Sequence, residues 1–159
     1  MPTLPWSQEL ELGLPVMDQT HREFVELLGR ARASSDEALP AAWQVLIEHT
    51  QAHFAQEDAW MHATAFASAK HHTIQHRVIL QVLREGAARA AEGNLTSMRL
   101  MTHELAVWFP QHAQTLDMEL ASHLARLGFD PATGEMSAPQ KEHQGCGSCA
   151  KCSCSGVPS

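Results

Sequence analysis

Apolar residues recur at helical spacing in four long stretches of the 159-residue chain. In the first stretch, residues 18–33, apolar side chains at positions 24, 25, 27, 28 and 31 follow the spacing of an amphipathic helix, and Asp18 is a suitable N-cap. The same spacing predicts helices over residues 41–62, about 68–91 and about 96–127. No stretch shows the alternation of apolar and polar residues that is typical of a β-strand, so we expect an all-α protein.

Short breaks separate the four predicted helices. They read SSDEALP at 34–40, ATAFAS at 63–68 and EGNLT at 92–96, and LGFDP closes the last helix. Because short connections make neighbouring helices antiparallel, the pattern predicts an up-down-up-down four-helix bundle. An extended N-terminal arm with Pro2, Pro5 and Pro15 precedes it. We therefore expect one bundle domain over residues 1–130 and a flexible, disordered Cys-rich tail over residues 131–159, which lacks apolar periodicity.

The composition narrows the range of functions. The formal net charge is −7, which argues against nucleic acid or an anionic membrane surface as a partner. No apolar run approaches the roughly 20 residues needed to span a bilayer, and the N-terminus lacks the apolar region of a secretory signal. We therefore expect a soluble, cytoplasmic protein without membrane insertion. The 11 histidines are the strongest chemical signal in the chain.

The predicted bundle brings six potential metal ligands to one level. Two residues on adjacent antiparallel helices lie at equal height when the mean of their numbers falls in the connecting turn. The mean of 21 and 53 is 37, that of 57 and 72 is 64.5, and that of 76 and 112 is 94, and each falls in a predicted turn. Spacings of four residues also place two side chains of a pair on one helix face. The six residues of this layer are His21, His53, Glu57, His72, His76 and His112.

Asp117 is a seventh candidate, but regular helix geometry does not bring it to the layer. It follows His112 by five residues, which is about 500° of rotation in an α-helix and leaves the two side chains about 140° apart. Only a local distortion of the helix would place both on one face. Pro110, two residues before His112, is a candidate cause of such a distortion.

Five imidazoles and one or two carboxylates at one level have the chemistry of a metal site. Two octahedral ions offer twelve coordination positions. Five histidine nitrogens, two carboxylates that each bridge both ions, and a bridging oxide or hydroxide leave one position open for a small ligand. Imidazole together with carboxylate favours iron among the first-row metals. The alternative, a structural layer of polar residues without metal, is disfavoured because so many buried polar groups would be costly.

The sequence around these candidates resembles that of hemerythrins in their bacterial single-domain form. The matching stretches are GLPVMDQTH at 13–21, HFAQEDAWM at 53–61, HTIQH at 72–76 and WFPQHAQTLD at 108–117, within residues 6–128. The resemblance implies a pair of non-haem iron ions with an oxo or hydroxo bridge. It also implies the ligands: His72, His76 and His112 for one iron, His21 and His53 for the other, and Glu57 and Asp117 bridging the two.

Apolar side chains near these residues are candidates for a pocket around bound O2. They are Trp108, Phe24, Leu28 and Phe54, of which Trp108, one turn from His112, is the first choice. Core packing explains each of them equally well.

The expected function is reversible O2 binding, for oxygen storage, delivery or sensing, rather than enzymatic turnover. A histidine-rich set of ligands has few carboxylates to stabilise high-valent iron, and the chain lacks the Glu-x-x-His motifs of oxygen-activating diiron bundles. Two alternatives stay open. One is a diiron redox enzyme that acts on NO or peroxide, and the other is a protein that handles iron or a soft metal.

All four cysteines lie in CGSCAKCSC near the C-terminus, at Cys146, Cys149, Cys152 and Cys154. Thiolates this close together suit a soft metal such as Zn²⁺ or Cu(I), an iron–sulfur cluster or a reversible disulfide. The alternative is a disordered tail with exposed thiols, since the sequence contains no second half of a zinc site.

Overall fold

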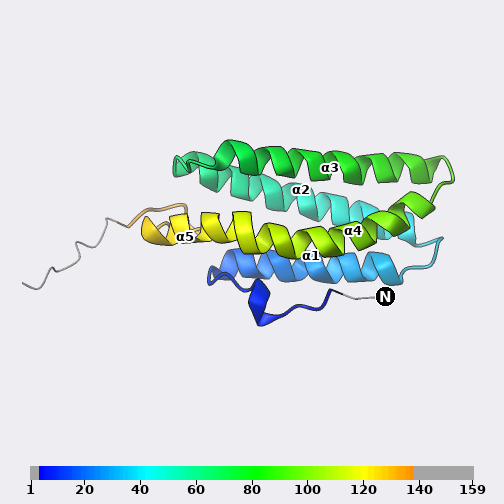
Figure 1. Ribbon diagram of the computed structural model, residues 1–159, viewed down its shortest axis with the longest axis horizontal. Helices are drawn as coiled ribbons and strands as arrows, with labels where there is room; N and C mark the ends of the chain where they lie inside the picture. The colour runs from blue at the N-terminus through cyan, green and yellow to red at the C-terminus, as the bar shows by residue number, and fades with distance from the viewer. Residues whose placement is uncertain (1–3, 138–159) are drawn as a thin grey trace, which may run out of the picture.

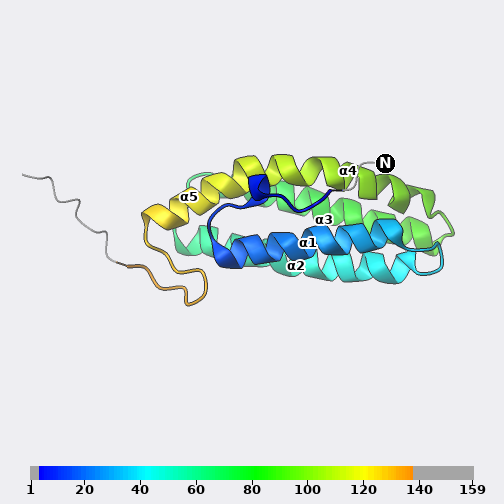
Figure 2. The same ribbon diagram turned by 90° about the horizontal axis from the view of Figure 1, so that it is seen from below.

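The computed structural model describes residues 4–137, which form an antiparallel bundle of long helices (Figure 1). Its helices are α1 (Pro15–Ala33), α2 (Leu39–Ala63), α3 (Ala69–Ala91), α4 (Thr96–His112) and α5 (Met118–Arg126). A π-helical segment, η2 (Ala113–Asp117), joins α4 to α5, so these three elements run as one long rod (Figure 2). The described residues contain no β-strand, only one isolated bridge. The predicted all-α, up-down-up-down bundle is confirmed.

The helix boundaries follow the sequence to within about two residues, with one correction at α1. This helix begins at Pro15 rather than after Asp18. Proline suits the first turn of a helix, because the N–H group that it lacks would have no partner within the helix there. Asp18 is therefore not the N-cap. It lies in the first turn, and its carboxylate accepts hydrogen bonds from the backbone N–H groups of Leu12 (2.7 Å) and Gly13 (3.1 Å). These bonds hold the N-terminal arm to the start of the helix.

The N-terminal arm packs along the bundle. It contains a short 3₁₀ helix, η1 (Gln8–Leu10), whose Leu10 side chain is buried. Trp6 lies 5.0 Å from the guanidinium group of Arg22, and Glu11 forms an ion pair with the same group at 2.6 Å. The arm therefore runs between α1 and the rod that begins with α4 (Figure 2).

Two apolar clusters fill the bundle, one on each side of a polar layer. The larger cluster includes Phe24, Leu28, Trp43, Leu83 and Phe109. The smaller cluster includes Met17, Trp60, Met61, Leu120 and Leu124. On every long helix, the candidate ligands lie between a residue of one cluster and a residue of the other. Apolar packing therefore encloses the polar layer from both ends of the bundle.

A glycine ends α5 and turns the chain back on itself. Gly128 adopts a left-handed backbone conformation (φ +58°), and its carbonyl oxygen accepts a hydrogen bond from the N–H group of Ser137 at 2.9 Å. Phe129, between them, is buried against the smaller cluster. The predicted Cys-rich tail lies outside the described residues from 138 onward. None of the helices from residue 4 to residue 137 is long and apolar enough to cross a membrane.

Candidate metal centre

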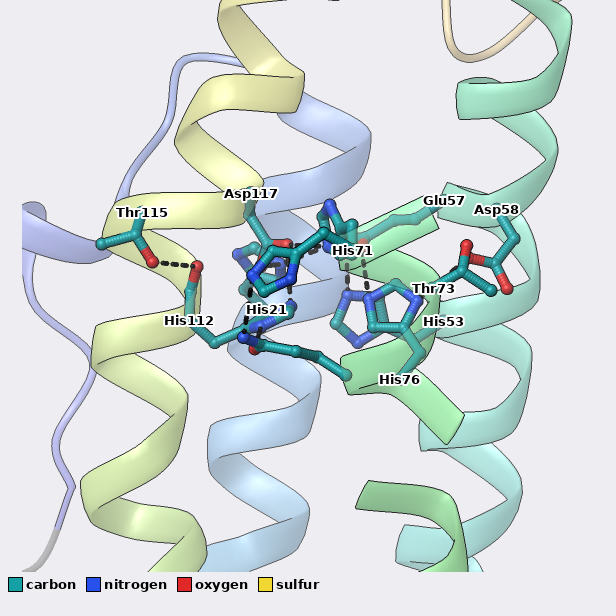
Figure 3. Close-up of polar contacts among 12 residues, drawn as sticks. His21, His53, Glu57, Asp58, His71, Thr73, His76, His112, Thr115 and Asp117 are labelled. Carbon is teal, nitrogen blue, oxygen red and sulfur yellow. Dashed lines mark hydrogen bonds and ion pairs between the residues drawn. The ribbon is translucent and has the colours of Figure 1, made fainter. Parts of the chain in front are cut away.

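Seven polar side chains from α1, α2, α3, α4 and η2 converge midway along the bundle (Figure 3). All are buried, and none exposes more than 4% of its surface. Buried imidazoles and carboxylates are costly unless they have partners, so these side chains require one another or a bound ion. The seven are the candidates from the sequence: His21, His53, Glu57, His72, His76, His112 and Asp117.

Two of the histidines face one side of the two carboxylates. Glu57 Oε1 lies 2.8 Å from His53 Nε2 and 3.6 Å from His21 Nε2. Asp117 Oδ2 lies 3.2 Å from the same nitrogen of His21. One donor atom from each of these four residues lies within 4.8 Å of the others. We call His21 and His53 the two-histidine group.

Three histidines face the other side. Glu57 Oε2 lies 3.4 Å from His72 Nε2 and 3.2 Å from His76 Nε2. Asp117 Oδ1 lies 3.0 Å from His72 Nε2 and 3.1 Å from His112 Nε2. We call these imidazoles the three-histidine group. Each carboxylate thus turns one oxygen toward each group, which is the arrangement required of a ligand that bridges two ions.

A π-helical turn brings Asp117 into this arrangement. In η2 the N–H group of Met118 donates to the carbonyl oxygen of Ala113, five residues earlier. A π-helix has more residues in each turn than an α-helix, and such single turns are frequent at functional sites. Asp117 therefore reaches the helix face of His112 although five residues separate them. The distortion that the sequence required is present.

A threonine stabilises the distorted turn. The Thr115 hydroxyl donates to the carbonyl oxygen of Gln111 at 2.6 Å and lies 3.5 Å from that of His112 (Figure 3). These bonds satisfy carbonyl groups near the change of helix type. Pro110, the suspected cause, lies within α4 before the π-helical turn begins.

The carboxylates and imidazoles of the cluster shift one another's pKa values. Burial disfavours the charged form of His21, but the carboxylates of Asp117 and Glu57 that face it outweigh burial and raise the pKa of His21 to about 9. The same balance raises the pKa of His72 to about 9. Burial also opposes ionisation of the two carboxyls, yet the facing histidines lower the pKa of Glu57 and that of Asp117. In the absence of metal, the cluster therefore carries protons on imidazoles that a metal would displace.

The donor atoms fit a pair of metal ions. In the part of the chain that the structure describes, the inner Nε2 atoms of His21, His72, His76 and His112 are buried without a hydrogen-bond partner. So are Glu57 Oε2 and both carboxylate oxygens of Asp117. Buried polar atoms without partners are costly, and a cation in each group would give these atoms a ligand bond. Imidazole nitrogen with carboxylate oxygen suits first-row metals such as iron.

Comparison with known proteins decides the family. A family model of the hemerythrin HHE cation binding domain matches residues 12–124, which include all seven side chains. The chain belongs to the hemerythrin family. It is 36% identical over 130 residues to a bacteriohemerythrin of Ralstonia nicotianae, a match that covers 82% of this chain and 95% of the relative. A bacteriohemerythrin of Stenotrophomonas maltophilia is 26% identical over 148 residues, 91% of each chain.

The resemblance found in the sequence is thereby confirmed. A third relative, a bacteriohemerythrin of Pseudomonas aeruginosa, is 24% identical over 97 residues, which are 58% of this chain and 63% of the relative. The family description and the buried histidine and carboxylate cluster together assign metal binding to this hemerythrin domain.

Polar side chains hold two imidazoles of the three-histidine group of the hemerythrin domain from outside. Asp58 Oδ1 accepts hydrogen bonds from His76 Nδ1 at 3.1 Å and from the Thr73 hydroxyl at 2.8 Å. Gln75 Oε1 accepts one from His112 Nδ1 at 3.2 Å. A proton on Nδ1 leaves Nε2 free to face a metal. The sequence reasoning missed Asp58 and Gln75, although each directly adjoins a candidate ligand in the sequence.

Aromatic rings cover the same three-histidine group. Phe54 stacks on the His76 ring, with centroids 3.9 Å apart and planes at 3°. Trp108 stacks on the His112 ring, with centroids 4.5 Å apart and planes at 27°. Two of the four pocket candidates therefore lie against this side of the hemerythrin cluster.

The two-histidine group adjoins a different apolar surface. Phe109 meets the His21 ring edge-on at 5.2 Å and packs against Phe24 at 4.6 Å. Phe24 and Leu28, the remaining pocket candidates, belong with Phe109 to the larger apolar cluster. The sequence analysis chose Trp108 as the aromatic residue one turn from the expected ligand His112. It did not consider the neighbouring Phe109.

The two-histidine group has weaker support from outside. In the described structure, the Nδ1 atoms of His21 and His53 have no hydrogen-bond partner. The His49 ring lies 6.2 Å from that of His53, and His49 Nε2 lies 3.2 Å from a carboxylate oxygen of Glu23. The four cysteines expected to bind a soft metal lie outside the described residues, so that role stays a prediction.

Proposed function

We propose that this chain binds O2 reversibly at two non-haem iron ions joined by an oxo or hydroxo bridge. One observation carries the proposal: each of two buried carboxylates turns one oxygen toward each histidine group. The ligands would be His72, His76 and His112 for one iron, His21 and His53 for the other, and Glu57 and Asp117 for both.

The unequal histidine groups support the binding of a small ligand. The three-histidine group would offer an ion three imidazoles and two carboxylate oxygens, which with a bridging oxide or hydroxide would fill six positions. The same count for the two-histidine group would leave one position for a small ligand. When bound, the iron pair supplies that position together with reversible electron donation to O2.

The protein's own contribution is to keep water from the two-histidine group. Phe109 covers the edge of the His21 ring, and Phe24 packs behind it. Both phenyl groups are about 99% buried, since each exposes only 1% of its surface. Apolar side chains beside the cluster supply no proton to a bound ligand. This favours release of unchanged O2 over the turnover of a redox enzyme.

We further propose that the protein acts in the cytoplasm, in oxygen storage, delivery or sensing. The negative net charge argues against a nucleic acid as a binding partner. The name bacteriohemerythrin shared by three relatives supports the same class of function.

Metal analysis and visible spectroscopy of the purified chain test the proposal. The protein should hold two irons per chain, and the anaerobically reduced form should gain a visible absorption band in air and lose it under argon. His76→Ala should lower the iron content, whereas His62→Ala, at an exposed position of α2, should not. Tightly bound zinc in place of iron, or irreversible oxidation in air without a distinct adduct, would refute the proposal.

A further inference from the structure

A surface hollow lies between α3 and α4 next to the three-histidine group. Its walls include Ile74, Val78, Trp108 and Gln111, and the buried His112 ring lies at its floor. Ile74 and Val78 expose 47% and 53% of their surfaces, which is high for large aliphatic side chains. Contiguous exposed apolar surface of this kind marks contact sites for other molecules.

The hollow is also a place where the metal centre comes close to the surface. Trp108 is partly exposed and stacks on His112, with ring centroids 4.5 Å apart. The opposite nitrogen of that imidazole, Nε2, lies 3.1 Å from the bridging carboxylate of Asp117. Two stacked π systems therefore connect the hollow with the cluster.

Positive charge lies on the other side of Ile74, which lines both this hollow and a second one, toward α2, that Lys70 and Arg77 line. Lys70, Arg77 and Arg84 follow one another at intervals of seven residues, so they share one face of α3, and all three are exposed. With Arg89 and one acid, Glu85, the net charge of α3 is +4 − 1 = +3, histidines excluded. By the same count, α1, α4 and α5 are neutral and α2 carries −3, in a chain of net charge −7.

The charges of this stripe are available to a partner. Within residues 4–137, neither Lys70 nor Arg77 forms an ion pair, and Arg84 donates only to the neutral amide oxygen of Gln51 at 3.0 Å. Two acids nearby form hydrogen bonds with residues outside the stripe. Asp58 accepts hydrogen bonds from a histidine and a threonine, and Glu119 accepts one from a serine hydroxyl at 2.9 Å.

We propose that the α3 stripe and the hollow beside Trp108 form a docking face for a small acidic protein that carries single electrons, such as a ferredoxin. This inference rests on the proposed diiron function, since a centre that has oxidised to the ferric state must be reduced before it binds O2 again. Apolar contact at the centre and charged contacts at the rim are the usual anatomy of a transient interface.

The redox step balances without any transferred atom. Two reduced carriers dock in turn, and each donates one electron by way of Trp108 and His112. Two ferric ions thereby become ferrous, and two carriers leave in the oxidised form.

Anaerobic stopped-flow kinetics test the charged rim. The diferric chain is mixed at low ionic strength with a reduced, acidic plant-type ferredoxin. Lys70→Glu/Arg77→Glu should slow reduction by about tenfold or more, and added salt should diminish the difference. Arg30→Glu/Arg126→Glu changes the charge equally at exposed positions on α1 and α5, and it should retain a rate close to that of the unmodified chain.

Two further pairs test the centre of the face. Ile74→Ser should weaken binding of oxidised ferredoxin to the metal-free chain, measured by calorimetry, whereas Val45→Ser should not, although the two side chains are exposed to 47% and 49%. Trp108→Leu should slow electron transfer from ferredoxin more than Trp108→Phe does, because phenylalanine retains a ring to stack on His112.

Reduced methyl viologen, a small donor that needs no docking face, separates the two proposals. Normal iron content and equal rates with this donor in the stripe variant, in Ile74→Ser and in their controls would show an intact centre. Equal ferredoxin rates for the stripe variant and its control would then overturn the docking face and leave the proposed function standing. Self-association of the chain that Ile74→Ser abolishes, or faster ferredoxin reduction after removal of residues 138–159, would also overturn it, since another occupant then covers the face.

Discussion

Removal of the Asp58 carboxylate should weaken metal binding by the three-histidine group without unfolding the bundle. Asp58 Oδ1 accepts hydrogen bonds from His76 Nδ1 and from the Thr73 hydroxyl, and it therefore fixes both the orientation and the tautomer of the imidazole (Figure 3). His76 is 1% exposed, so in Asp58→Ala its Nδ1–H group would stay buried without this partner. The ring would then be free to turn its Nε2 atom away from the carboxylate of Glu57, now 3.2 Å away.

The expected loss is about 10- to 100-fold in metal affinity, the usual effect of removing an outer hydrogen-bond partner from a histidine ligand. This corresponds to about 1.4–2.7 kcal/mol. Asp58→Asn should lose less, because an amide oxygen still accepts the bond but no longer provides the charge that strengthens it. The Asp58 side chain is 36% exposed, so solvent screening limits its contribution to the unfolding free energy of the metal-free protein to under about 1 kcal/mol.

Cobalt(II) titration in competition with a chelator measures this affinity, with the visible absorption of the bound ion as the readout. Glu119→Ala is the control, since this exposed carboxylate bonds to Ser68 rather than to a histidine of the cluster. Circular dichroism of the metal-free variants checks the fold. Equal cobalt affinity for Asp58→Ala, Glu119→Ala and the unmodified chain would refute the reasoning.

Three other predictions concern packing, the tail and protons. Phe109→Ala should lower the unfolding free energy in urea by about 3–5 kcal/mol, whereas Val107→Ala, at a side chain exposed to 61%, should change it by less than about 0.5 kcal/mol. Removal of residues 138–159 should leave the iron content, the stability and the spectrum of the oxygen adduct unchanged. The raised pKa values, about 9 at His21 and His72, mean that the folded chain without metal binds protons more tightly than the unfolded chain does. Its unfolding free energy should therefore fall as the pH rises from about 6.5 to about 9. Metal binding should displace these protons, and a pH indicator would detect their release.

The fold and the polar layer could be predicted because they depend mainly on where the helices and turns lie along the chain. In an antiparallel bundle, the position of a turn sets which residues on its two helices lie at one height. Three turns, recognised from Gly, Pro, Ser and Asn, therefore place His21 beside His53 and Glu57 beside His72. An error of one or two residues at a helix end, as at α2, does not disturb this relation, because it leaves the helix register unchanged.

Side-chain direction around the layer was not predictable in the same way. Asp58 and Gln75 adjoin Glu57 and His76 in the sequence, but adjacent residues point about 100° apart on a helix. Whether such a side chain reaches solvent or a neighbouring helix depends on rotamer and on helix rotation. Asp58 reaches α3 and bonds to His76, while Gln75 reaches α4 and bonds to His112. Neither outcome follows from spacing alone.

For Asp117, the sequence indicated that the helix must be distorted, but only the folded structure shows the form of the distortion. The spacing of five residues from His112 established that a regular helix fails, and the resemblance to hemerythrins implied that both residues are nevertheless ligands. The form of the distortion depends on hydrogen bonds that only the folded chain displays: the Met118 N–H group reaches back five residues, and the Thr115 hydroxyl satisfies the carbonyl oxygen of Gln111. Leu120 belongs to one apolar cluster and Phe109 to the other, and His112 and Asp117 lie between them along the chain. A single π-helical turn places His112 and Asp117 on one face, although Asp117 follows His112 by five residues.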